Sequence, residues 1–182
     1  MKTKVFFTIS LFLLTILITG CGTKSEVNLD NNLKNIMQVK SSSFEHNQNL
    51  PSQYTCDGEG INPPLQISEI PEGTQSLALI SDDPDASSGD FTHWLVWNID
   101  PTISEIAENS VPEGAVEGTT DFGNTGYGAP CPPSGSHHYY FKVYALDTKL
   151  DLSSEAKKAN LEKAMEGHVL DKAEIVGLYT RE

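Results

Sequence analysis

The chain has 182 residues, a formal net charge of −13 at pH 7 and a sequence pI of about 4.6. This excess of acidic residues argues against nucleic acid or an anionic membrane face as a broad electrostatic partner. The length suits a single domain with one hydrophobic core.

The first twenty residues are typical of a secretory signal. Lys2 and Lys4 precede an uncharged apolar run at 5–19, which is too short and wrongly flanked for a membrane span. The run ends in the tetrad ITGC, which resembles a bacterial lipobox, where cleavage precedes the cysteine and its thiol receives a diacylglycerol. We expect residues 1–20 to be a lipoprotein signal peptide and Cys21 to be lipidated. An ordinary signal peptide with an incidental cysteine is the alternative.

Residues 21–35 are polar and rich in Asn, which favours a lipidated cysteine followed by a flexible tether. From 36 to 182 the apolar residues alternate or form short runs between turn residues, as in packed antiparallel sheets. This pattern predicts one mainly β domain. Its expected strands are Met37–Phe44, Leu65–Ser68, Leu77–Asp82, Phe91–Ile99, Tyr139–Leu146 and Glu174–Thr180.

The segment FTHWLVWNI at 91–99 is bulky on both of its alternating faces, so we expect a central strand. Strict alternation puts the odd-numbered residues, from Phe91 to Ile99, on one face. The even-numbered residues, including Trp94, share the other.

One segment has a convincing helical period, near the C-terminus. Apolar and aromatic positions recur at spacings of three and four, after serines that suit an N-cap. We expect a short helix covering one end or edge of the sheets, with Leu161, Ala164, Met165 and His168 on one face and Ser153 or Ser154 as its cap.

Three polar clusters interrupt the apolar pattern where a strand meets a loop. They are the acidic turn 82–85, His93, and the pair His137 and His138, with Tyr139 on the same strand face as His137. Each has a structural alternative: a turn former, a packed core imidazole and a polar strand entrance. Adjacent strand residues point to opposite faces, so at most one histidine of the pair can serve a given pocket. Together, the clusters indicate a small polar pocket beside a stiff Pro-Pro loop.

Motifs for catalysis or metal binding are lacking in the sequence. It has no Cys-x-x-Cys or His-Glu-x-x-His spacing for zinc and no Gly-x-Ser-x-Gly nucleophile motif. No glycine-rich loop leads into a helix, as phosphate-binding nucleotide folds require. We therefore expect a binding pocket without catalytic residues, metal or cofactor.

Six motifs follow one another over most of the chain after residue 37. They are YTCDGEGINPPL (54–65), SLALISDDPDA (76–86), HWLVWNI (93–99), DFGNTGYGAPCPPSGSHHY (121–139), FKVYALD (141–147) and AMEGHVLDKAEIVGLYTR (164–181). In this order and spacing they resemble the phosphatidylethanolamine-binding protein family, also called Raf kinase inhibitor protein-like, and specifically its bacterial YbhB/YbcL-like branch. The resemblance implies a two-sheet antiparallel Greek-key sandwich with a short C-terminal helix and a small anion-binding pocket.

The resemblance also implies which residues line the pocket. The first Asp of the family's DPDA motif falls on Asp83, and the His of its HW pair falls on His93. The other matches lie in the second loop and the strand after it, at Cys131, Pro132, Pro133, His137 and Tyr139. If Asp83 approaches His93 or His137, it should favour a protonated imidazole that donates to an anion. Backbone N–H groups along 127–131 could complete the cradle.

Three departures from the family pattern lie near these matches. His138 stands where the family usually has Arg, which puts a contact of that guanidinium in doubt. Ala129 stands where Gly is common, and Thr120 replaces an Asn often found before the DFG triplet.

Cys56 and Cys131 remain once Cys21 is assigned to lipid. In an oxidising compartment they can pair or stay free, and the residues alone do not decide. The resemblance places their loops at one end of the sandwich, which makes a disulfide feasible.

The expected function is that of a non-enzymatic binding protein, anchored by lipid at Cys21 to the extracytoplasmic side of a bacterial membrane. Its ligand would be a small phosphorylated or headgroup-like anion, and it could modulate a partner protein. One alternative is an inhibitor of an extracytoplasmic enzyme such as a peptidase. Another is a hydrolase that uses Asp83 and the pocket histidines.

Overall fold

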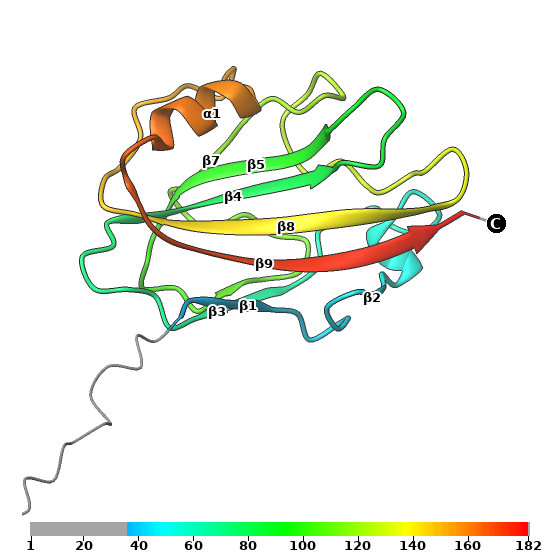
Figure 1. Cartoon of the computed structure of the whole chain (residues 1–182), viewed down its shortest axis with the longest axis horizontal. Helices are drawn as coiled ribbons and strands as arrows, with labels where there is room; N and C mark the ends of the chain where they lie inside the picture. The colour runs from blue at the N-terminus through cyan, green and yellow to red at the C-terminus, as the bar shows by residue number, and fades with distance from the viewer. Residues whose placement is uncertain (1–35, 182) are drawn as a thin grey trace, which may run out of the picture. The chain divides into compact units, whose positions relative to one another are not determined.

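The computed structural model describes residues 36–181 (Figure 1). The expected signal peptide, Cys21 and tether lie outside the described residues. Across 36–181 no helix is long and apolar enough to cross a membrane.

The domain is mainly β, with two sheets and one short helix, as predicted. The larger sheet has the strand order β2-β9-β8-β4-β5-β7 and the smaller one β1-β3-β6. The strands are β1 Gln38–Lys40, β2 Gln48–Asn49, β3 Leu65–Ser68, β4 Ser76–Asp83, β5 Phe91–Ile99, β6 Glu105–Ile106, β7 Val116–Glu117, β8 Ser136–Leu146 and β9 Val169–Thr180, with a 3-10 turn, η1, at Ser52–Tyr54.

The strand pairs are antiparallel, except that the two-residue β2 runs parallel to β9. β4 and β5 form a hairpin-like pair, and the long connection after β5 brings β8 back beside β4. Such a return is the defining connection of a Greek key.

Both faces of the larger sheet are covered, which explains why all eight residues of β4 are buried. Leu77 and Leu79 face the smaller sheet and join the inter-sheet core. Ala78 and Ile80 face the helix and join a second, helix-side core. Figure 1 shows the resulting layers, with α1 on one side of the larger sheet and β1 and β3 on the other.

The helix α1, Lys158–Met165, buries Leu161 and Met165 as its period predicted. The expected serine cap is wrong, because the residue before the first turn is Lys157, whose backbone N–H donates to Oδ1 of Asn160 at 3.0 Å. His168 lies beyond the helix. The Asn160 side chain thus satisfies the N–H of the cap residue, and the backbone N–H of Asn160 donates to the Lys157 carbonyl at 2.9 Å, so the first turn closes without a serine cap.

Strict alternation along β5 is also wrong, because the strand carries two bulges. Leu79 lies opposite Val96 but Leu77 lies opposite Ile99, so β5 has an extra residue between these partners. Ile99 therefore packs in the inter-sheet core with Val96 rather than on the opposite face. The second bulge lies between Thr92 and Trp94, which are paired with consecutive residues of β4.

Candidate functional site

A cavity of about 170 Å³ lies where β4, β5 and β8 meet the loops at one end of the larger sheet. All seven residues proposed for the pocket line it. The lining consists of Asp83, Ala86, Ser87, Phe91, His93, Phe122, Cys131, Pro132, Pro133, His137 and Tyr139. The residues that the sequence did not single out are Ala86, Ser87, Phe91 and Phe122.

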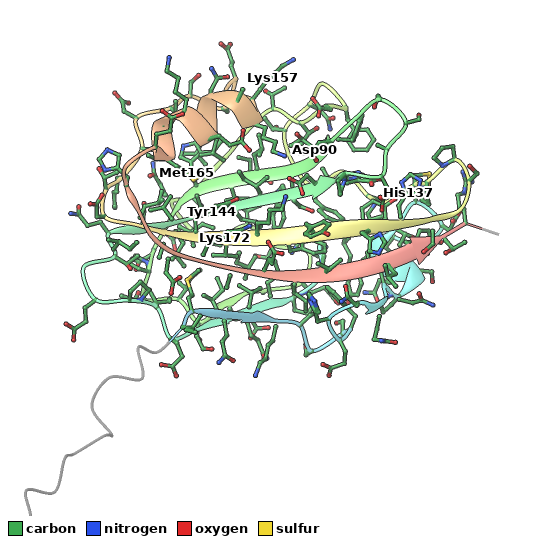
Figure 2. The ribbon with its side chains drawn as sticks, in the orientation of Figure 1. Asp90, His137, Tyr144, Lys157, Met165 and Lys172 are labelled. Atoms are coloured by element: carbon green, nitrogen blue, oxygen red, sulfur yellow. A yellow bond between two sulfur atoms is a disulfide. The ribbon has the colours of Figure 1, made fainter. Side chains whose placement is uncertain are left out.

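The polar centre of this pocket is an ion pair between β4 and β8. Nδ1 of His137 lies 2.7 Å from Oδ2 of Asp83, and both side chains are buried, with residue exposures of 8% and 3%. Oδ1 of Asp83 accepts from the backbone N–H of Asp85 at 2.9 Å. The carboxylate is thus fixed through both oxygens, and Nε2 is the ring nitrogen of His137 left for a ligand. Figure 2 shows His137 at the start of β8, well away from Met165 on α1.

His138 lies outside the pocket, as the alternation of side chains predicts. Its Nδ1 and its backbone N–H both contact Oδ2 of Asp85, at 2.6 and 2.9 Å, and its side chain is exposed. Hydrogen bonds from His138 lower the pKa of Asp85. The DPDA turn therefore divides its two carboxylates between the pocket, at Asp83, and the surface, at Asp85.

His93 comes from the bulge in β5, and bulges characteristically re-aim a side chain. Its Nδ1 lies 2.6 Å from the carbonyl oxygen of Gly128. A carbonyl only accepts, so Nδ1 carries a hydrogen. Burial lowers the pKa of His93 below 6.5, although the Gly128 carbonyl and the Asp83 charge act in the opposite direction. At His93 the Asp83 charge thus acts in the expected direction, toward protonation, but desolvation outweighs it.

Tyr139 forms the floor between the two histidines. Its ring centroid lies 5.2 Å from that of His93, at 90°, and 6.4 Å from that of His137, nearly parallel to it. Its hydroxyl is buried and forms no hydrogen bond of ordinary geometry with residues 36–181, although the Asp83 carboxylate lies close enough to interact with it. Burial and the nearby Asp83 carboxylate raise the pKa of the Tyr139 phenol, so it stays an uncharged donor. A buried hydroxyl that faces a cavity without a protein partner indicates that a water or a ligand in the cavity accepts its hydrogen bond.

Two phenylalanines form the mouth of the pocket. Phe122 packs edge-to-face on Phe91, with ring centroids 4.9 Å apart, and on His93 at 5.3 Å. It remains 50% exposed. A Cβ atom at Gly128 would lie 2.2 Å from the Phe122 ring, so this glycine admits the ring. A lone aromatic residue in the polar loop 119–126 was the sequence signal that could have identified Phe122.

The pocket loop is tied to the loop after η1. Cys56 and Cys131 are joined by a disulfide with a Cα–Cα distance of 5.4 Å, the pairing that the sequence left open. The backbone N–H of Cys56 also donates to the carbonyl of Pro130 at 3.0 Å. The backbone N–H of Gly128 donates to the carbonyl of His93 at 2.8 Å, so it is not part of the expected N–H cradle.

Asp82, the neighbour of Asp83, points to the opposite face of β4. Its carboxylate accepts from Lys142 at 2.8 Å and from Lys158 of α1 at 2.6 Å, and Lys158 also contacts Asp90. This network anchors the helix and takes no part in the pocket.

A family model described as phosphatidylethanolamine-binding protein matches residues 40–180. A UPF0098 protein of Methanothermobacter thermautotrophicus is 49% identical over 150 residues, covering 80% of this chain and 99% of the relative. A UPF0098 protein of Pyrococcus horikoshii is 51% identical over 155 residues, covering 80% of this chain and 78% of the relative.

Two solved structures have a similar fold. One is described as a phosphatidylethanolamine-binding protein homolog of Chlamydia trachomatis, with a TM-score of 0.78, 40% identity and coverage of 81% of this chain and 99% of that one. The other is E. coli YbcL, described as a member of the mammalian PEBP family, with a TM-score of 0.76, 34% identity and coverage of 80% and 99%.

Proposed function

Because the chain belongs to the phosphatidylethanolamine-binding protein family, we propose that its pocket binds a small phosphorylated or headgroup-like anion. The observation that carries this proposal is the unpartnered, buried hydroxyl of Tyr139 between two imidazoles. An anion supplies the acceptor that this hydroxyl lacks. The protein then acts by binding its ligand rather than by turning it over.

The donors in the pocket suit an oxyanion. The hydroxyl of Tyr139 donates to one ligand oxygen, and Nε2–H of a protonated His137 donates to another, with Asp83 holding Nδ1 and balancing the ring charge. Neutral His93 offers Nε2 as an acceptor, because its Nδ1–H is committed to Gly128. A singly protonated phosphate has both kinds of group, acceptor oxygens and one P–OH donor.

A binding role is supported by the state of the reactive groups in the pocket. The sulfur of Cys131 is bonded to Cys56. Ser87 lines the cavity, but within the described chain it makes no hydrogen bond to either histidine. A nucleophile is normally activated by such a contact with a base.

We place the protein on the extracytoplasmic side of a bacterial membrane, anchored by lipid at Cys21. The lipobox-like tetrad supports the anchor, and the Cys56–Cys131 disulfide supports an oxidising compartment. No cofactor and no nucleic acid belong to this proposal.

Calorimetric titration with inorganic phosphate and with phosphorylethanolamine at pH 6 tests the proposal. His137→Ala should weaken binding by roughly 1.5–3 kcal/mol, because a charge-assisted hydrogen bond is lost. His138→Ala is the matched control and should have little effect, since that ring lies outside the cavity. The proposal fails when neither anion binds, or when the His138 variant loses more affinity than the His137 variant.

A further inference from the structure

A second cavity, of about 250 Å³, shares no lining residue with the anion pocket. It lies between the segments 60–62 and 109–111 and the β5–β7 pair. Its polar and aromatic walls are Asn62, Trp94, Asn109, Ser110, Glu117 and Tyr127.

Glu117, on β7, is the charged group of this cavity. Its Oε1 accepts from the indole N–H of Trp94 at 2.7 Å, which fixes the carboxylate. The side chain is half-buried, yet no Lys, Arg or His of the described chain pairs with it. By contrast, the fully buried carboxylates Asp82 and Asp83 have lysine or histidine partners.

A purely structural role does not account for the charge of Glu117. An indole N–H needs one neutral acceptor, which the amide of a glutamine would supply without placing a charge in a half-buried site. Among residues 36–181 the second carboxylate oxygen and the negative charge have no hydrogen-bond or ionic partner.

The rim of the cavity is preformed. The amide nitrogen of Asn62 donates to the carbonyl of Ala107 at 3.0 Å, and its Oδ1 accepts from the backbone N–H of Ser110, also at 3.0 Å. Asn109 adopts a left-handed backbone conformation, with φ of 49°. The side-chain oxygens of Asn109 and Ser110 make no hydrogen bond to other residues of 36–181.

From these contacts we propose that the second cavity binds a primary alkylammonium group, with the Glu117 carboxylate as its counter-ion. An ammonium has three N–H donors and no acceptor. The cavity offers three side chains with free acceptors, at Glu117, Asn109 and Ser110. The alkyl part would lie against Ile61, Val111 and the Tyr127 ring, which line the same cavity.

A divalent metal ion fits this site less well. Ca²⁺ and Mg²⁺ take six or more oxygen ligands and usually several charges. Across residues 36–181, no three His, Cys, Asp or Glu side chains gather in a way that could hold a metal ion. A monovalent organic cation matches the single carboxylate, and the net charge of −13 favours its approach.

The indole N–H of Trp94 is a natural reporter, because the chain has two tryptophans and only Trp94 contacts Glu117. Nuclear magnetic resonance should follow both indole resonances of the purified protein during titration with n-propylammonium chloride. Saturable shifts are expected at Trp94 and not at Trp97, which packs in the helix-side core. Sodium chloride at equal ionic strength and propan-1-ol, the neutral analogue, should cause no saturable shift.

Glu117→Gln is the decisive variant, since it keeps an acceptor for Trp94 and removes the charge. It should weaken n-propylammonium binding about tenfold or more, the loss expected for a hydrogen bond to a charged group. Glu113→Gln, an exposed carboxylate that does not line this cavity, should bind like the unmodified protein. Equal shifts with propan-1-ol, or undiminished binding by Glu117→Gln, would overturn the proposal.

Discussion

The Asp83 carboxylate holds Nδ1 of His137 at 2.7 Å inside the anion pocket, so the negative group faces the imidazole. Asp83→Asn should therefore weaken phosphate binding by roughly 1–2 kcal/mol, although it removes a negative charge from an anion site. The reason is that the carboxylate contacts Nδ1 of His137 at 2.7 Å and so holds the ring with its other nitrogen directed to the ligand. Calorimetry with inorganic phosphate measures the change. Asp85→Asn removes the same charge from the exposed pair with His138 and should change affinity little; tighter binding by Asp83→Asn would show that this assignment is wrong.

His93 should make stability depend on pH. Its pKa is lowered in the folded protein, so the unfolded chain binds the proton more readily. The stability that the uncharged His93 ring contributes to the folded protein is fully present above about pH 6.5, the ordinary pKa of histidine. This stability is lost as the pH falls toward the lower pKa that His93 has in the folded protein. Urea unfolding at pH 7.5 and at pH 5 should show this loss, and His93→Gln should reduce it. An unchanged pH slope in His93→Gln would contradict the prediction.

The disulfide should stabilise both the domain and its pocket. It links residues 75 apart in the sequence, so removal by Cys56→Ser together with Cys131→Ser should lower the free energy of unfolding by roughly 2–4 kcal/mol. Phosphate affinity should also fall, because the loop carrying Pro132 loses its tie. Dithiothreitol should reproduce both effects in the unmodified protein and change nothing in the double variant. Two free thiols in exported protein, by non-reducing mass analysis, would rule out the pairing.

Gly128 and Phe122 should be energetically coupled. Gly128→Ala places a methyl group 2.2 Å from the Phe122 ring, and such overpacking should destabilise the protein by about 1–3 kcal/mol. Phe122→Ala should cost less, since half of that ring is exposed. The double variant lacks the Phe122 ring, so Gly128→Ala should lower the free energy of unfolding less in the Phe122→Ala background than in the unmodified protein. Denaturant unfolding of the unmodified protein, the two single variants and the double variant gives the four unfolding free energies of this double-mutant cycle. If the losses of the two single variants add up to the loss of the double variant, the coupling is excluded.

Cys21→Ser should release the protein from the membrane or leave its precursor uncut. The motivation is the lipobox-like tetrad ITGC at the end of the apolar run. Membrane fractionation and labelling with a palmitate analogue measure the outcome. A serine variant that still carries lipid in the membrane fraction would refute the anchor.

Much of the pocket could be predicted because its polar residues lie at strand ends within distinctive motifs. Asp83, His93 and His137 interrupt apolar runs, and that contrast is visible in one sequence. Ala86 and Ser87 are ordinary turn residues, and the sequence around Phe91 is equally consistent with a core residue and a pocket residue. These residues line the cavity because of the path of the β4–β5 connection, which the local sequence does not predict.

The bulges of β5 could not be predicted for a related reason. A bulge changes which face a residue occupies without changing the composition of the strand. Asn98, with φ of 58°, is the local sign of the bulge between Val96 and Ile99, since Asn tolerates this conformation better than most residues. The early part of β9 was missed because Val169 and Leu170 are exposed, so backbone pairing with β8 rather than burial defines that part of the strand.

Cys56 is synthesised 75 residues before Cys131, an interval of roughly 4–15 s at about 5–20 residues per second. The only other cysteine made by then is Cys21. A bond between Cys21 and Cys56 would leave Cys131 without a partner. A thioether at Cys21 takes that sulfur out of thiol–disulfide exchange. The lipidation proposed for Cys21 would therefore leave the chain with two thiols, Cys56 and Cys131, and a single way to pair them.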